Sequence, residues 1–207
     1  MKPEAVIFDI GNVLLRWDPE GFYDREIGED RRRALFAETG LAQMNEAVDA
    51  GAPFRASVEA LAGRHPAHAG AIRLWYDRWH DIASPPIEGA IRLRDCLRAK
   101  GIPVFALTNF GDESWDHALT RYGFLAEFDR LYISGRLRLV KPDPVLYAHV
   151  EADCGIAPDR LLFADDRAEN IVTAANRGWR THQVETWQGL ARRLVAEGLL
   201  TPGEAGL

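Results

Sequence analysis

The chain has 207 residues, of which 47% are hydrophobic and 27% charged, and its formal net charge is −6. This length fits one ordinary domain, or one domain with a modest insertion, and the composition excludes disorder, collagen or a coiled coil as descriptions of the whole chain. The acidic balance gives no support for a nucleic-acid partner, because proteins that bind nucleic acid carry a basic footprint.

The cysteine content, the N-terminal segment and the lengths of the apolar runs together predict a protein of a reducing compartment. The two cysteines, Cys96 and Cys154, do not make a disulfide framework, and we interpret both as free thiols. The N-terminal segment is too polar for a signal peptide, since Asp9 and Asn12 interrupt its apolar run. No stretch of about 18 apolar residues is present that would span a membrane. We therefore expect a cytoplasmic protein with no membrane partner.

Short apolar runs rich in β-branched and aromatic residues predict buried strands. They span residues 5–8, 104–107, 131–134, 161–164 and, less clearly, 181–184. Helical patterns separate them, over residues 88–100, 112–122, 143–155, 167–177 and 187–197, and most end at a glycine. Strands that alternate with helices predict a parallel sheet covered on both faces. We expect the tail TPGEAGL to be frayed.

Residues 17–86 break this alternation. No strand-like run appears there, and helical patterns dominate, over residues 20–27, 31–38, 43–49, 54–63 and 68–81. Ile72, Trp75, Tyr76 and Trp79 form an apolar stripe at helical spacing, which we interpret as the buried side of a helix rather than a substrate platform. The segment is therefore predicted to be a helical insertion between the first strand and the rest of the sheet.

Polar residues follow the predicted strands where those strands end. In an open α/β sheet, ligands bind outside the carboxyl ends of the strands. Clustered carboxylates repel one another unless a cation lies between them, and Mg²⁺ takes carboxylates together with water and phosphate oxygens. A hydroxyl and an ammonium group suit the other oxygens of a phosphoryl group, so the set predicts phosphoryl transfer to a carboxylate. The residues are Asp9, Thr108, Asn109, Lys141, Asp165 and Asp166.

Four motifs carry these residues in a specific order: VIFDIGNVL at 6–14, LTN at 107–109, KPDP at 141–144 and LLFADD at 161–166. With them the chain resembles the haloacid dehalogenase superfamily of hydrolases over nearly its whole length. The resemblance implies an α/β fold with a three-layer, Rossmann-like parallel-sheet core. That core would comprise residues 1–16 and 87–207, and residues 17–86 would form an inserted helical cap.

The resemblance also implies a role for each matched residue. Asp9 corresponds to the nucleophile that becomes an aspartyl-phosphate. Thr108 corresponds to the hydroxyl that holds a phosphoryl oxygen, with Asn109 beside it in the substrate site. Lys141 corresponds to the lysine that bridges nucleophile and phosphate, so that it serves both catalysis and substrate binding. The Mg²⁺ ligands would be Asp9, Asp165, Asp166 and the main-chain carbonyl of Gly11.

The chain departs from the usual phosphatase pattern at Gly11. Most phosphatases of this superfamily carry a second aspartate there, which acts as general acid and base, and such catalysis is typically worth about 10²–10⁴-fold. A subset of sugar-phosphate phosphatases also reads DxGNV. We therefore expect slow turnover or substrates with good leaving groups, such as sugar 1-phosphates, unless Asp18 or a water fills the gap. Arg16 and Arg25 are further candidates to reach the site.

These observations predict a Mg²⁺-dependent phosphatase. Its substrate would be a small phosphorylated metabolite, with sugar phosphates among the candidates. The protein is expected to be a monomer or a small homo-oligomer. One alternative is a 2-haloacid dehalogenase-type hydrolase that uses the same Asp9 against carbon. That branch, however, has a tyrosine at the position of Gly11 and uncharged residues in place of Asp165 and Asp166. The other alternative is a non-catalytic phosphate-binding or regulatory module that lost turnover with its acid/base group.

Overall fold

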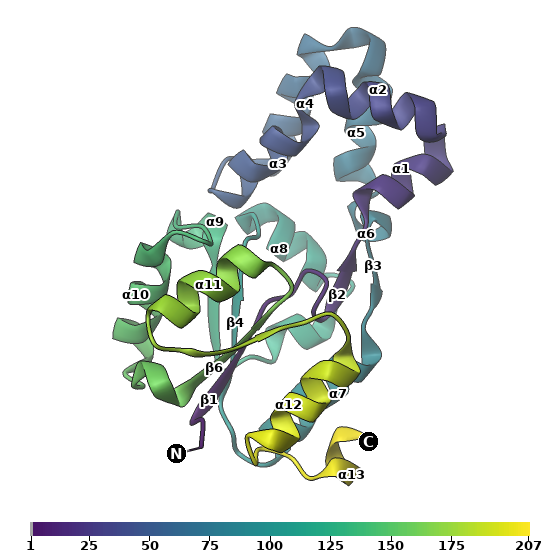
Figure 1. The fold of residues 1–207 in the computed structure, drawn as a ribbon. Helices are drawn as coiled ribbons and strands as arrows, with labels where there is room; N and C mark the ends of the chain where they lie inside the picture. The colour runs from purple at the N-terminus through teal and green to yellow at the C-terminus, as the bar shows by residue number, and fades with distance from the viewer. Residues whose placement is uncertain (1) are drawn as a thin grey trace.

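The computed structural model describes residues 2–207. Its centre is a five-stranded parallel sheet in the order β5-β4-β1-β6-β7 (Figure 1). The strands are β1 (Ala5–Phe8), β4 (Val104–Thr108), β5 (Arg130–Ile133), β6 (Leu161–Asp165) and β7 (Arg180–Gln183). Each lies within one residue of its predicted run, so the α/β prediction with a parallel sheet is confirmed.

Helices cover both faces of this sheet, because alternate residues of each buried strand point to opposite sides. In β1, Val6 and Phe8 belong to one apolar cluster, and Ala5 and Ile7 belong to the other. The first cluster is closed by α7 (Glu88–Ala99), α8 (Asp112–Leu119) and α12 (Trp187–Ala196). The second is closed by α10 (Pro144–Cys154) and α11 (Ala168–Asn176). The fold is therefore three-layered.

Six helices within residues 19–82 form a separate group, which is called the cap below and stands beyond one end of the sheet in Figure 1. They are α1 (Pro19–Ile27), α2 (Glu29–Thr39), α3 (Leu41–Asp49), α4 (Phe54–Arg64), α5 (Ala69–Asp77) and α6 (Trp79–Ile82). The single helix predicted over 68–81 is interrupted at Arg78, which is the C-cap of α5. The apolar stripe faces the inside of the cap as predicted: Ile72, Trp75 and Trp79 are buried, and Tyr76 is partly buried.

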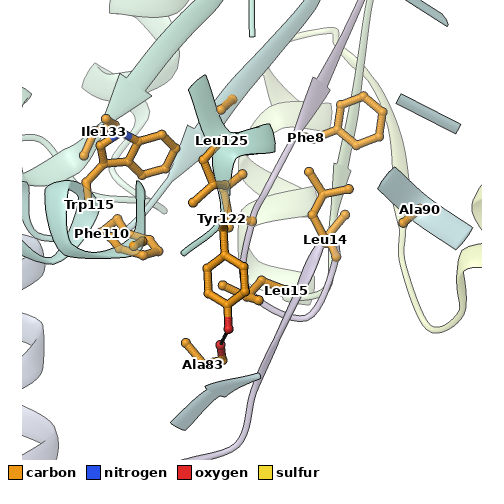
Figure 2. Packing of buried hydrophobic residues seen from close by; sticks show 14 of the residues in the cluster. Phe8, Leu14, Leu15, Ala83, Ala90, Phe110, Trp115, Tyr122, Leu125 and Ile133 are labelled. Carbon is orange, nitrogen blue, oxygen red and sulfur yellow. Dashed lines mark hydrogen bonds between the residues drawn. The ribbon is translucent and has the colours of Figure 1, made fainter. Parts of the chain in front are cut away.

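The prediction that residues 17–86 hold no strand is wrong. Two short strands, β2 (Leu15–Trp17) and β3 (Ala83–Pro86), pair antiparallel and link the cap to the sheet. They are too short to show alternation, and the two prolines of β3 argue against a strand in the sequence. Figure 2 shows how β3 is anchored: the Tyr122 hydroxyl donates a hydrogen bond to the Ala83 carbonyl over 2.7 Å. Leu15 lies beside the Tyr122 ring in Figure 2, and both belong to the larger apolar cluster.

The expectation of a frayed tail is also wrong. Residues Pro202–Ala205 form helix α13, whose first turn is closed by a capping box between Thr201 and Glu204. Ala205 is fully buried, and Glu204 pairs with Lys100 of the α7 end over 2.9 Å. The remaining short elements are α9 (Ser134–Leu137) and the 3₁₀ turns η1 (Pro66–His68), η2 (Gly123–Ala126) and η3 (Pro158–Arg160). Within residues 2–207, every helix lacks the length and hydropathy needed to cross a bilayer.

Candidate active site

Three carboxylates meet at the carboxyl edge of the sheet. Asp9 follows β1 directly, Asp165 ends β6 and Asp166 comes next. Because β1 and β6 are parallel neighbours in register, their ends bring these side chains together. One oxygen from each of the three residues lies within 4.8 Å of the others. The structure thus assembles the acidic group that the sequence placed at strand ends.

Lys141 reaches into this acidic group from the loop before α10. Its Nζ lies 2.9 Å from Asp9 Oδ1 and 2.6 Å from Asp165 Oδ2. Burial alone would lower the pKa of the Lys141 ammonium, but the two carboxylates outweigh it and the pKa is raised. Asn109 holds the loop in place, since its Oδ1 accepts from the Lys141 N–H over 2.7 Å and its Nδ2 donates to the Lys141 carbonyl over 2.9 Å. Asn109 therefore positions Lys141.

The charges of this group do not balance within the protein. Burial raises the pKa of Asp9 to about 7, Asp165 and Asp166 raise it further, and Lys141 opposes them. Burial also raises the pKa of Asp166. Three carboxylates share one ammonium group, and a divalent cation would remove the remaining repulsion. Oxygen ligands of this kind and number fit Mg²⁺.

Two asparagines that the sequence argument overlooked orient the acidic side chains. Asn170 Nδ2 donates to both oxygens of Asp165, over 3.0 Å each. Asn12 Nδ2 donates to Asp166 Oδ2 over 3.2 Å, from a left-handed backbone with φ of 52°. Such contacts fix the direction of ligands to a metal ion. The role of Asn12 could have been inferred from the sequence, because this residue lies within the first motif. Asn170 lies in helix α11, and no motif there marks it as a partner of Asp165.

Thr108 and Gly11 flank the acidic group. Thr108 ends β4, the other neighbour of β1, and is 1% exposed. It therefore lies at the same edge of the sheet as Asp9. A Cβ atom built on Gly11 would find its nearest neighbour, Trp17 Cβ, at 4.0 Å, which is ordinary contact distance. The position would therefore accept a side chain, although this chain has none there.

A cavity of about 770 Å³ opens beside Asn12, between β2, β3 and the first cap helix. Arg16 and Arg25 line it, as does Asp18. Asp18 is the N-cap of α1, where its Oδ1 accepts from the Gly21 N–H over 2.9 Å. Its Oδ2 lies 3.8 Å from Arg25. Asp18 is thus used to start a helix. The two arginines share this cavity with Asn12, which donates a hydrogen bond to Asp166.

Residues 3–178 match the family model described as haloacid dehalogenase-like hydrolase. The chain belongs to this family. The confirmed membership covers all four motifs and the cap, and it makes the protein a hydrolase.

Among curated relatives, the D-ribitol-5-phosphate phosphatase of Bacteroides thetaiotaomicron is 24% identical over 87% of this chain and 91% of its own length. A HAD-family enzyme from the same organism, solved in complex with magnesium and inorganic phosphate, superposes with a TM-score of 0.64. It is 22% identical and covers 91% of this chain and 98% of its own. L-2-haloacid dehalogenase from Xanthobacter autotrophicus superposes with a TM-score of 0.58 at 23% identity, over 98% of this chain and 86% of its own.

Proposed function

We propose that this protein is a Mg²⁺-dependent phosphatase that hydrolyses a small phosphomonoester through an aspartyl-phosphate on Asp9. One observation carries the proposal. The Lys141 ammonium lies between Asp9 and Asp165, and Asp166 completes a group of three carboxylates within 4.8 Å. This arrangement provides a nucleophile, a fixed cation next to it and ligands for a second, divalent cation.

The hydrogen bonds of Asp9 prepare it for attack on phosphorus. The Ile10 N–H donates to Asp9 Oδ1 over 2.7 Å, and Lys141 contacts the same oxygen. Among the described residues no hydrogen bond reaches Oδ2, which is therefore the oxygen available to the substrate and the metal. When bound, Mg²⁺ supplies the positive charge that lets a phosphate dianion approach this acidic group. Thr108 and Lys141 then hold the phosphoryl oxygens at the edge of the sheet.

The cavity beside Asn12 suits a small polyhydroxylated leaving group. It is lined mainly by charged and polar side chains, among them Arg16 and Arg25, which offer hydrogen bonds to hydroxyl groups. The similarity to a D-ribitol-5-phosphate phosphatase supports the same class of substrate. We therefore propose sugar or polyol phosphates, converted in the cytoplasm.

The acidic group also argues against the two alternatives. Without a metal ion, as in a dehalogenase, the three carboxylates would share only the Lys141 ammonium. The superposition on a dehalogenase reflects the shared fold. A module that only binds phosphate needs no free Asp9 oxygen beside a buried lysine. Both alternatives remain outcomes of the experiment below.

The experiment measures phosphate release from a panel of sugar and polyol phosphates, with Mg²⁺ and with EDTA. We expect release with Mg²⁺ and none in EDTA, and Asp9→Asn serves as the inactive control. Chloride release from 2-chloropropionate in EDTA would instead identify a dehalogenase. Trapping of Asp9 by beryllium fluoride without turnover of any substrate would identify a binding module.

A further inference from the structure

The proposed reaction needs a proton donor that the acidic group does not contain. When the P–O ester bond breaks, an alkoxide leaves, and such a poor leaving group needs a proton from a general acid. Asp9 serves as nucleophile, Lys141 is held between two carboxylates, and Gly11 has no side chain. Asp18 caps α1. A donor must therefore come from elsewhere.

The end of α3 brings a carboxyl group to the core. Asp49 is the last residue of this cap helix, and its main-chain carbonyl accepts a hydrogen bond from Ser134 Oγ over 2.6 Å. The same Ser134 Oγ accepts from the Phe110 N–H over 2.8 Å. Phe110 directly follows Thr108 and Asn109. Ser134 thus ties the end of α3 to the loop that directly follows Thr108.

Glycines on both sides allow this close approach. A Cβ atom on Gly111 would lie 2.5 Å from Val48 Cγ1 and 3.1 Å from the Val48 carbonyl. A Cβ atom on Gly51 would lie 2.9 Å from the Gly135 carbonyl. A side chain at either position would push the cap away from the core. The main chain around Asp49 is therefore packed directly against the loop that follows β4 and against the start of α9.

The side chain of Asp49 is held by groups that carry no charge. Asn45 Nδ2 donates to Asp49 Oδ2 over 3.0 Å, and the Trp75 indole N–H fixes the Asn45 amide by donating to its Oδ1 over 3.1 Å. The Gly111 N–H donates to the carboxyl from the core side. No cation pairs with Asp49 among the ion pairs of residues 2–207.

Burial raises the pKa of Asp49 to about 7, and the charges of Asp9 and Glu46 raise it further. The Gly111 hydrogen bond and the charge of Lys141 oppose this rise. A large part of the Asp49 population therefore carries a proton at neutral pH. Gly111 follows Asn109 by two residues, and Asn109 holds Lys141 through two hydrogen bonds, so the loop against which the end of α3 packs also positions a reacting group.

We propose that Asp49 is the general acid of the reaction and takes the role for which Gly11 has no side chain; this inference rests on the proposed phosphatase function. As the bond from Asp9 to phosphorus forms and the ester P–O bond breaks, the Asp49 proton moves to the leaving oxygen. The Asp49 carboxylate then accepts a proton from the water that attacks the aspartyl-phosphate. Inorganic phosphate leaves, and Asp9 and the acid form of Asp49 are restored.

The test compares leaving groups in Asp49→Asn, which keeps the size of the side chain. With an alkyl phosphate, whose leaving group needs protonation, kcat/KM is expected to fall about 10²–10⁴-fold. With p-nitrophenyl phosphate, whose leaving group departs without a proton, the fall is expected to stay below about tenfold. We use kcat/KM because it reports the steps up to departure of the leaving group. A loss of equal size with both substrates would overturn the proposal.

Two further variants complete the test. Asp18→Asn retains a good N-cap residue, and any loss is expected to be the same for both substrates. Asn45→Ala keeps the Asp49 carboxyl but removes the hydrogen bond that holds it. We expect kcat/KM to fall less than in Asp49→Asn, with the same dependence on the leaving group. This second variant carries the test if Asp49→Asn does not fold. A loss that depends on the leaving group in Asp18→Asn alone would assign the proton to Asp18 and overturn the inference.

The activity of the wild-type protein distinguishes a failure of the proposed phosphatase function from a failure of the proposed role of Asp49. Wild-type protein that releases no phosphate from any substrate contradicts the proposed function and the role of Asp49 together. Active wild-type protein with an Asp49→Asn variant that treats all leaving groups alike contradicts the role of Asp49 only.

Discussion

The sheet edge around Asp9 and the cap edge around Asp49 both hold carboxyl groups whose pKa values are raised to about 7, but they differ in their neighbours. Asp9 has two further carboxylates and a buried lysine beside it. Asp49 has an amide and a main-chain N–H. The first set of neighbours favours binding of a cation, and the second favours retention of a proton. Burial alone therefore does not assign a role, and the neighbouring groups decide it.

The largest effect is expected from Asp9→Asn, which removes the nucleophile. Phosphate release is expected to fall by about 10⁴-fold or more for every leaving group, since no other residue forms the covalent intermediate. Assays with an alkyl and an aryl phosphate check this. Residual activity that differs between the two substrates would show that the two regions do not act separately.

Gly11→Asp in the Asp49→Asn background tests whether one carboxyl replaces the other. The space at Gly11 admits a side chain, and we expect kcat/KM for alkyl phosphates to recover by about 10–100-fold. In the otherwise unchanged protein, Gly11→Asp is expected to raise turnover of substrates with poor leaving groups. No recovery in the double variant, with its fold intact, would count against an interchangeable acid.

Asn170→Ala tests the metal-binding region by itself. Loss of both hydrogen bonds to Asp165 is expected to weaken Mg²⁺ binding by about 10–100-fold. Titration of activity and of thermal stability with Mg²⁺ measures the change. Asp49→Asn is the matched comparison, and its Mg²⁺ dependence is expected to match that of the wild type.

The smallest effect concerns stability and pH at Asp49. Its pKa is about 7 in the folded protein and 3.8 as the reference value, so ionisation opposes folding above about pH 4 and does so fully above pH 7. Asp49→Asn removes this penalty. The gain in its free energy of unfolding over wild type is expected to be about 1–3 kcal/mol larger at pH 8 than at pH 4, after allowance for partial solvent exposure. Urea denaturation at both pH values provides the measurement, and a difference that does not change with pH would mean that Asp49 is ionised throughout.

The elements of the sheet and its flanking helices were predictable because their patterns are local. An apolar run such as residues 104–107 marks a strand wherever it lies in the fold. The misjudged tail also had a local signal, because Thr201 and Glu204 stand at the spacing of a capping box. The pairing of Leu15 with Pro86 had none, because neither strand is stable without the other and their contact crosses the whole cap.

The order of strands and helices along the chain was enough to bring a set of polar residues to one edge of the sheet: Asp9, Thr108, Lys141, Asp165 and Asp166. The carboxyl ends of parallel strands, and the loops that follow them, always lie at the same edge of a sheet. The packing of the end of α3, which carries Asp49, against the loop that follows Thr108 depends on the tertiary structure. The link between Asp49 and Ser134 joins residues 85 positions apart, and such a contact depends on how the cap packs against glycines of the core, which no local pattern of residues encodes.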